Sequence, residues 1–528
     1  MKRLAARLLL IATAAATAAA GPALAQPSAH ASAQAPVRTR SGLLTGTETS
    51  QPGVRAYLGV PFAAPPVGDA RWRPPRAVSA WSGVRAADHF APACIQPGPE
   101  TFGPWTPEFL LRGPVSEDCL YLNVWTGAGP GGRRPVLVFV HGGGFAAGSG
   151  DVPVYDGARL AAKGLVVITI NYRVGALGFL AHPALTAESR RHSSGDYGLL
   201  DQVAALEWVR DDVAAFGGDP RRVTVAGQSA GAVSVALLTV SPLARGLFQR
   251  VVVESGPGAL TAFGMPDTRG VARPLAEAER EGVAFAAAKG ATSLAALRAL
   301  PASAFVSESD APPMHLGPVV DGYFLPDDLA ALVAAGRQHD VPMLTGLNAD
   351  EGSAFAGYGR VTADQFRKEA ARRYGARARE FLARYPARSD SEAGRSQTAS
   401  ARDAAMAGVL EMLTERARTA RTPAYAYYFD RAIPWPEHPE FGAFHTAEVP
   451  YVFGTLDVLP RPWEETDRRL SDVMMRYWVN FATRGDPNGP GLPAWPSFAR
   501  GRPSVMELGA SVRARPWPEH ARLRFFTR

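Results

Sequence analysis

The sequence has little lysine, little cysteine and no long apolar run after its first 25 residues. Only 4 of its 56 basic residues are lysine, and the formal charge of the 528-residue chain is +7. Nucleic-acid binding needs basic residues concentrated on one face, so this weak charge argues against that class. No later stretch reaches the roughly 20 apolar residues of a membrane span, so no stable span is expected. A hydrophobic content of 46% excludes a disordered chain.

The N-terminus has the features of a secretory signal. A basic MKRLAAR segment precedes an apolar run from Leu8 to Ala20, and Ala23-Leu24-Ala25 is a small-residue cleavage pattern. We therefore expect residues 1–25 to be a signal peptide, residues 26–36 a flexible Ala-, Ser- and Pro-rich leader, and the protein to be periplasmic or secreted. Loss of three basic residues with the signal would leave a charge of +4. A retained N-terminal anchor is the alternative.

Cysteine is limited to Cys94 and Cys119. An even cysteine count in an exported protein indicates a disulfide, and CxxC spacing typical of metal ligands is absent. Closing a loop of about 25 residues would stabilise the fold by roughly 3 to 4 kcal/mol in the chain-entropy treatment. Two buried free thiols are the alternative.

The middle of the chain alternates β-rich apolar runs with helical patterns, which predicts a parallel sheet covered on both faces. The helical patterns include 198–216, which ends at Gly217-Gly218, and a helix that begins at Ala230. Without a repeat or a Gly/Ser linker, residues 37–528 are expected to form a single α/β domain. Ala- and Arg-rich segments at 269–311 and 361–422 are expected to be helical insertions that cap one end of the sheet. The predicted strands are 135–140, 165–171, 222–226, 250–254, 341–346 and 424–430.

A candidate nucleophile follows the third of these strands. The segment Gly227-Gln228-Ser229-Ala230-Gly231 matches G-x-S-x-G, with a strand before it and a helix-like run after it. This is the context of a nucleophile elbow, in which small residues two positions on either side make room for the tight turn. Ser229 is the predicted nucleophile.

A serine hydroxyl needs a base and a carboxylate, which in this fold follow the serine in the order acid, histidine. Downstream histidines are His315, His339, His438, His445 and His520. His445 is favoured because it lies between a small-residue stretch and an apolar segment, and His438 is the alternative. The acid should follow the strand 341–346, where Asp350 and Glu351 are adjacent. The residue pattern does not choose between these two carboxylates.

Six motifs occur together in the order and rough spacing of the type-B carboxylesterase family, which the chain resembles from about Val37 to its C-terminus. That family includes bacterial para-nitrobenzyl esterases and the cholinesterases. The resemblance implies an α/β-hydrolase fold, Glu351 as the acid, His445 as the base and a disulfide between Cys94 and Cys119. The motifs are HGGGF at 141–145, EDCLYLN at 117–123, GQSAG at 227–231, FGGDP at 216–220, NADEG at 348–352 and FHTAEVPYVFG at 444–454.

The oxyanion hole is predicted from position and resemblance together. A glycine run after strand 135–140 can present backbone N–H groups without obstruction, and the residue after the nucleophile adds one at a helix N-terminus. We assign Gly143, Gly144 and Ala230 to it, with His141 orienting the glycine run. The resemblance also suggests that Ser255 hydrogen-bonds to the triad acid.

Other features bear on the substrate. Many family members carry Glu where this chain has Gln228, and its absence argues against a choline ester. Aromatic residues of the Cys94–Cys119 loop either line a gorge or only pack the loop, namely Phe102, Trp105 and Phe109.

The predicted function is a serine carboxylesterase that acts on a small-molecule ester through an acyl-enzyme intermediate. HExxH, P-loop and dinucleotide-binding motifs are absent, so neither a metal nor an organic cofactor is expected. The chain is expected to be a monomer. The alternatives are a serine hydrolase of the same fold that cleaves amides, lactones or carbamates, and a non-catalytic cholinesterase-like binding protein.

Overall fold

The computed structural model describes residues 35–264, 271–306, 316–518 and 522–527. The predicted signal peptide and nearly all of the predicted leader lie outside these ranges. His315 and His520, two of the candidate bases, lie outside them as well.

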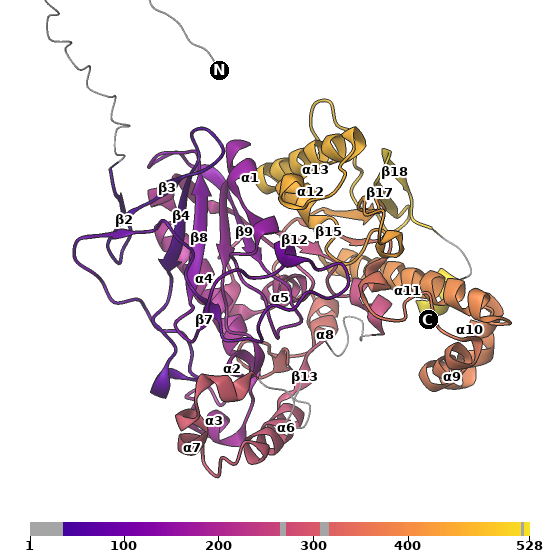
Figure 1. The fold of residues 1–528 in the computed structure, drawn as a ribbon, viewed down its shortest axis with the longest axis horizontal. Helices are drawn as coiled ribbons and strands as arrows, with labels where there is room; N and C mark the ends of the chain where they lie inside the picture. Colours follow the sequence, from indigo (N-terminus) through magenta and orange to yellow (C-terminus); the bar gives the residue numbers. More distant parts are fainter. Residues whose placement is uncertain (1–34, 265–270, 307–315, 519–521, 528) are drawn as a thin grey trace, which may run out of the picture. The chain divides into compact units, whose positions relative to one another are not determined.

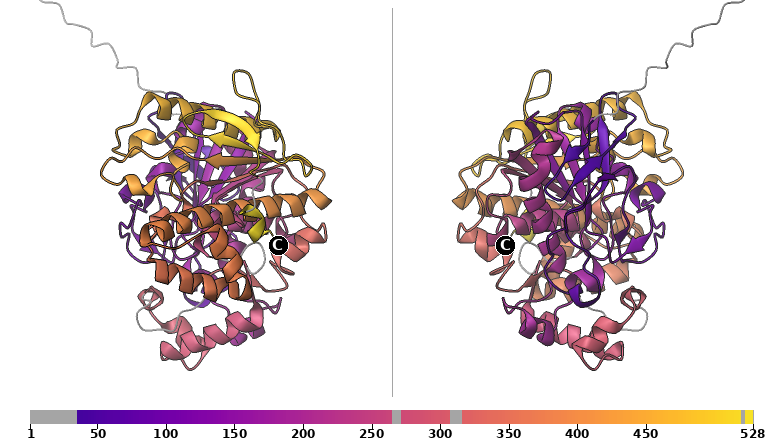
Figure 2. Two further views of the ribbon diagram at one scale, coloured as in Figure 1. Left: turned by 90° about the vertical axis from the view of Figure 1, so that its right-hand side faces the viewer. Right: turned by 90° about the vertical axis from the view of Figure 1, so that its left-hand side faces the viewer.

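An 11-stranded sheet forms the centre of the molecule, with strand order β18-β17-β16-β15-β12-β11-β9-β10-β8-β4-β3. Strands from β10 to β17 in this order run parallel, and the strands added at both margins pair antiparallel. Figure 2 shows the two opposite edges, with the yellow C-terminal strands on one and the indigo N-terminal strands on the other. The strands of this sheet are β3 (Thr47–Glu48), β4 (Arg55–Pro61), β8 (Tyr121–Thr126), β9 (Arg134–Val140), β10 (Val166–Ile170), β11 (Gly218–Gln228), β12 (Arg250–Glu254), β15 (Met343–Asn348), β16 (Ala424–Phe429), β17 (Ser504–Leu508) and β18 (Val512–Pro516).

The six strands predicted from sequence are β9, β10, β11, β12, β15 and β16, and they are consecutive neighbours in the sheet. Their Val-, Ile- and Leu-rich runs are buried on both faces, as a parallel sheet requires. The antiparallel margins were not predicted. Short strands complete the described β-structure: β1 (Val37–Arg38), β2 (Leu43–Thr45), β5 (Val84–Ala86), β6 (Ala93–Cys94), β7 (Val115–Ser116), β13 (Arg273–Pro274) and β14 (Val319–Val320).

Helices cover both faces of the sheet. In Figure 1, α12 and α13 lie above it, whereas α4, α5 and α8 lie below it. Within the described residues, no helix is both long and apolar enough to cross a bilayer. The α-helices are α1 (Ala158–Ala162), α2 (Gly175–Phe179), α3 (Pro183–Glu188), α4 (Tyr197–Asp212), α5 (Ala230–Leu238), α6 (Leu275–Ala288), α7 (Leu294–Ala299), α8 (Leu329–Ala334), α9 (Ala363–Tyr374), α10 (Ala378–Arg384), α11 (Asp390–Thr419), α12 (Val449–Phe453), α13 (Glu465–Arg484) and α14 (Leu523–Phe526).

The two predicted insertions are helical and form two separate groups. Helices α6 and α7 interrupt the sheet between β12 and β15 and lie beside α2 and α3 (Figure 1). Helices α9 to α11 interrupt it between β15 and β16, and α11 packs on the short helices that follow β12 and β15. Helix α11 also contacts β15 directly. Parts of the first predicted insertion, residues 269–270 and 307–311, lie outside the described residues.

Candidate active site

Ser229 stands on a strained turn between β11 and α5. Its φ of 58° is in the left-handed region, which non-glycine residues rarely adopt. A Cβ on Gly231 would lie 2.0 Å from the carbonyl oxygen of Val140, and one on Gly227 would lie 2.4 Å from that of Gly231. The two glycines therefore let β9 and the turn approach closely, and they hold Ser229 at the carboxyl edge of the sheet.

His445 and Glu351 lie against each other, although 94 residues separate them in sequence. Nδ1 of His445 is 2.5 Å from Oε2 of Glu351, and both side chains are almost fully buried. The other carboxylate oxygen of Glu351 accepts hydrogen bonds from Ser255 Oγ at 2.7 Å and from the Asn348 backbone N–H at 2.9 Å. Three donors thus fix the orientation of this carboxylate.

Asp350, the adjacent carboxylate that the residue pattern left open, faces elsewhere. Its Oδ1 accepts a hydrogen bond from Nη2 of Arg402 at 2.8 Å, and its Oδ2 accepts one from the Ala443 backbone N–H at 3.1 Å. The backbone N–H of Asp350 donates to the carbonyl of Ala443. Asp350 therefore ties the loop that carries His445 to the end of β15, while Glu351 contacts the imidazole.

The remaining nitrogen of His445 faces Gln228. Nε2 lies 3.3 Å from the Gln228 amide nitrogen, which can only donate. Nε2 then accepts, and the imidazole proton is on Nδ1, where it bonds to Glu351. This is the tautomer that a general base requires. Within the described ranges, no hydrogen bond joins Ser229 Oγ to His445.

Three other histidines, His141 before Ser229 and His339 and His438 after it, have surroundings that do not suit a base. His438, the alternative base, is exposed and lies 3.4 Å from Glu440 Oε1. His339 is half-buried against Phe248, and this partial burial lowers its pKa to about 4. His141 is stacked on Tyr172 beside its own glycine run, and burial lowers its pKa to about 4. His141 is therefore a neutral neighbour of the glycine run, in line with the orienting role expected for it.

Gly143 and Gly144 form a tight turn after β9, with φ of 112° and 63°. The Gly143 carbonyl accepts hydrogen bonds from the N–H groups of Ala146 and Ala147 at 3.1 and 3.0 Å. Among the described residues, none accepts a hydrogen bond from the backbone N–H of Gly143, Gly144 or Ala230. These three donors, together with Ser229, border one cavity.

That cavity has a volume of about 1010 Å³, and Ser229 and His445 line it. The indole N–H of Trp105 donates a hydrogen bond to Thr446 Oγ1 at 3.0 Å. Thr446 directly follows His445 in the chain and has a strained φ of 88°. Phe263 packs edge-on to the His445 ring, with centroids 5.0 Å apart. The aromatic residues Phe102, Trp105 and Phe109 of the disulfide loop all line the cavity, as do Phe145, Phe263 and Phe355. Of the two alternatives for the aromatic residues of the Cys94–Cys119 loop, the structure therefore favours the one in which they line a gorge.

Two further glutamates are buried behind Glu351. Asn348 Nδ2 donates to Glu448 Oε2 at 2.5 Å, and Trp478 Nε1 donates to Glu254 Oε1 at 2.6 Å. Burial, and then the charge of Glu351, raise the pKa of Glu448 to about 7. Burial raises the pKa of Glu254 well above its ordinary value. Because Glu254 and Glu448 are buried and their negative charges repel each other, we expect this pair to be partly protonated near neutral pH.

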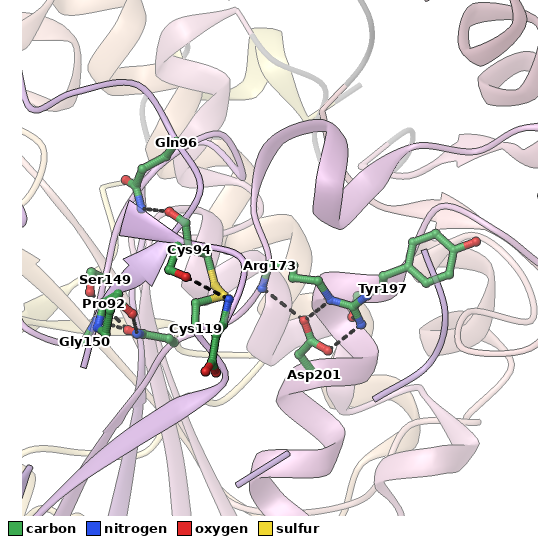
Figure 3. Close-up of a disulfide and its surroundings, with 12 residues drawn as sticks. Pro92, Cys94, Gln96, Cys119, Ser149, Gly150, Arg173, Tyr197 and Asp201 are labelled. Atoms are coloured by element: carbon green, nitrogen blue, oxygen red, sulfur yellow. Dashed lines mark hydrogen bonds and ion pairs between the residues drawn. A yellow bond between two sulfur atoms is a disulfide. The ribbon is translucent and has the colours of Figure 1, made fainter. Parts of the chain in front are cut away.

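The disulfide between Cys94 and Cys119 is confirmed. Figure 3 shows it beside Gln96, Ser149 and Gly150, close to the buried ion pair of Arg173 with Asp201. Arg173 lies just after β10 and Asp201 lies in α4. Hydrogen bonds of 2.6 to 3.0 Å from Arg173 to the Asp201 carboxylate join these two elements.

An elbow serine, a buried carboxylate–imidazole pair and free N–H donors on a mostly parallel sheet are features of an α/β-hydrolase. Residues 33–526 match the carboxylesterase family. The chain is 39% identical to the fumonisin B1 esterase of Sphingopyxis macrogoltabida, over 90% of this chain and 86% of that protein. It is 33% identical to the cocaine esterase of Homo sapiens, over 88% of this chain and 86% of that protein. The chain belongs to the carboxylesterase family and is a carboxylic ester hydrolase.

Several polar residues around the site were not singled out from sequence. Asn348 contacts both Glu351 and Glu448, Arg402 holds Asp350, and Gln96 bonds to the backbone at Gly148. Asn348 lies inside the NADEG motif, which was a usable signal. Arg402 and Gln96 carry no local signal, because their partners are about 50 residues away in the chain.

Proposed function

We propose that the chain hydrolyses esters through an acyl-enzyme intermediate on Ser229, with His445 as general base and Glu351 as its carboxylate partner. The observation that carries this proposal is the 2.5 Å contact between Glu351 and His445 Nδ1. It leaves Nε2 as the basic nitrogen, which faces Gln228, the residue before Ser229, and His445 and Ser229 line the same cavity.

In the first half-reaction, Ser229 Oγ attacks the ester carbonyl as His445 Nε2 takes the hydroxyl proton. For this step the serine hydroxyl must replace Gln228 as the donor to Nε2. The tetrahedral oxyanion accepts hydrogen bonds from Gly143, Gly144 and Ala230, each worth roughly 3 to 4 kcal/mol of transition-state stabilisation. Collapse expels the alkoxide, which receives the proton from His445, and water then repeats the sequence to release the acid.

Ser229→Ala tests this proposal, with Ser241→Ala as the matched control. Ser241 is a buried serine whose Oγ has no hydrogen-bond partner among the described residues, and it lies beyond the far end of α5. Hydrolysis of para-nitrophenyl esters from acetate to decanoate should fall on the order of 10⁶-fold in kcat in Ser229→Ala only. A serine-directed phosphonate should add its mass to the peptide containing Ser229. A Ser229→Ala enzyme with full activity would refute the proposal, as would a folded wild type inert across the ester series.

We further propose that the preferred ester has a bulky apolar group and no net charge. The cavity is lined mainly by aromatic and aliphatic side chains. Arg273, which also lines it, already pairs with Glu277 and Glu281 at 2.6 Å each. Aryl and medium-chain esters should therefore have lower KM values than choline or dicarboxylate esters. Amides, lactones and carbamates of the same acyl groups would distinguish an esterase from the other acyl-transfer chemistries.

We also propose that the protein is exported and monomeric. The Cys94–Cys119 disulfide supports export, because such bonds persist in oxidising compartments. N-terminal sequencing of the mature protein should begin near Gln26, and light scattering should give the mass of one chain. A cytosolic protein with an intact N-terminus would contradict export.

A further inference from the structure

The side chain of Gln96, two residues after Cys94, is hydrogen-bonded to Gly148. Gly148 lies in the turn that follows β9, residues 141–150, which we call the glycine turn. Its Nε2 donates to the Gly148 carbonyl at 2.8 Å and to the Cys94 carbonyl at 2.9 Å. Its Oε1 accepts from the Gly148 backbone N–H at 2.7 Å. One amide thus bonds to both polar groups of the Gly148 backbone, which fixes its position and its orientation. Gln96 is buried, and it lies directly beside the disulfide in Figure 3.

Gly148 is in turn in close contact with the start of the same turn. Its φ is 117°, and a Cβ there would lie 2.4 Å from the Gly142 carbonyl oxygen and 2.2 Å from His141 Nδ1. Ala147, its neighbour, donates to the Gly143 carbonyl. A displacement of Gly148 would therefore be transmitted to Gly142 and Gly143 through direct contacts.

The side-chain amide of Asn171 is hydrogen-bonded to the last residues of the glycine turn. Asn171 Oδ1 accepts hydrogen bonds from Ser149 Oγ and from the Gly150 N–H, at 3.1 and 2.8 Å. Its Nδ2 donates to the carbonyl of Pro92 at 3.2 Å. The segment from Pro92 to Gln96 is therefore joined to the glycine turn at two points, and the disulfide anchors that segment in its middle (Figure 3).

We propose that Gln96 is a positioning residue for the oxyanion hole, and that the Cys94–Cys119 disulfide is the anchor from which it acts. This rests on the proposed function, in which Gly143 and Gly144 donate to the oxyanion. Full negative charge on that oxygen exists only near the transition state, so misplaced donors weaken transition-state binding more than substrate binding. Loss of Gln96 should therefore lower kcat with little change in KM.

Gln96→Met tests the proposal, because methionine keeps the length of the side chain and removes all three hydrogen bonds. Gln249→Met is the matched control. Gln249 Oε1 accepts from the Val223 N–H at 2.8 Å, at the opposite end of the strands from the site. With para-nitrophenyl butyrate, we expect kcat of Gln96→Met to fall about 10- to 100-fold with KM within about twofold. Gln249→Met should keep wild-type values for both constants.

An inhibitor pair separates positioning from general structural damage. A trifluoromethyl ketone forms a tetrahedral adduct with an oxyanion, whereas an amide analogue of the substrate resembles the ground state. The inhibition constant of the ketone should rise by the same factor as kcat falls in Gln96→Met, and that of the amide should stay unchanged. Gln96→Glu, which keeps only the acceptor, serves the same comparison if Gln96→Met does not fold.

Cys94→Ser/Cys119→Ser enzyme should show the same pattern as Gln96→Met, at a temperature at which it stays folded. The inference is wrong if Gln96→Met keeps kcat and ketone affinity within twofold of wild type. It is also wrong if both inhibitors weaken equally. A wild type that no trifluoromethyl ketone inhibits, or an active Ser229→Ala enzyme, would instead refute the proposed function itself.

Discussion

The amide nitrogen of Gln228 lies 3.3 Å from Nε2 of His445, the imidazole atom to which Ser229 must deliver its proton in the proposed mechanism. A neutral donor at this place holds the imidazole in the basic tautomer and adds no negative charge to the cavity. Gln228 and Ser229 are consecutive residues, so one turn presents both the resting partner of the base and the nucleophile.

Gln228→Glu should shift the acidic limb of the kcat/KM profile to higher pH. A carboxylate at this distance stabilises the imidazolium, so a larger share of the enzyme lacks its base at any given acidic pH. We expect a displacement of about one pH unit. The profile should be measured with an uncharged ester, and Gln249→Glu should leave it in place. An unmoved profile would show that residue 228 does not face the base during catalysis.

Glu351→Gln and Asp350→Asn should separate the two adjacent carboxylates. Glu351→Gln should lower kcat about 10⁴-fold, the loss seen when the acid of a protease triad becomes an amide. Asp350→Asn weakens the bonds to Arg402 and to the loop at Ala443 but leaves the Glu351–His445 contact, so a loss under about tenfold is expected. Both variants should be compared by kcat and by thermal unfolding. The reverse order of activities would contradict the assignment of Glu351.

Gly231→Ala should impair both folding and activity. The new methyl group would meet the Val140 carbonyl oxygen at 2.0 Å, so β9 and α5 must separate. Overpacking of this kind costs about 1 to 3 kcal/mol of unfolding free energy. Gly501→Ala is the control, because nothing lies within 4 Å of a Cβ at that position. Denaturant unfolding should show the difference, and equal stability of the two variants would contradict the close approach.

The parallel centre of the sheet could be predicted from sequence because continuous Val, Ile and Leu runs are a local signal of burial on two faces. The margins could not, since β4 includes Gly59 and Pro61 and β18 is a largely exposed VRARP segment. Ser229 was predictable from its own strand–turn–helix context. The choice between Asp350 and Glu351 required either the family resemblance or the pairing of Asp350 with the loop at Ala443, which is a long-range contact.

Glu448→Gln should make the folded state less sensitive to pH between about 4.5 and 7. Burial and the charge of Glu351 raise the pKa of Glu448 to about 7, so the folded state binds its proton more tightly than the unfolded chain does. The stability from this group is therefore complete below about pH 4.5 and is lost as the pH rises through about 7. Glutamine is neutral throughout and its carbonyl oxygen can still accept the hydrogen bond from Asn348.

The difference in Tm, variant minus wild type, should thus increase by a few degrees from pH 5 to pH 8. Glu437→Gln, at an exposed position, should show no such trend. A constant difference for Glu448→Gln across this range would mean that Glu448 is already ionised at pH 5.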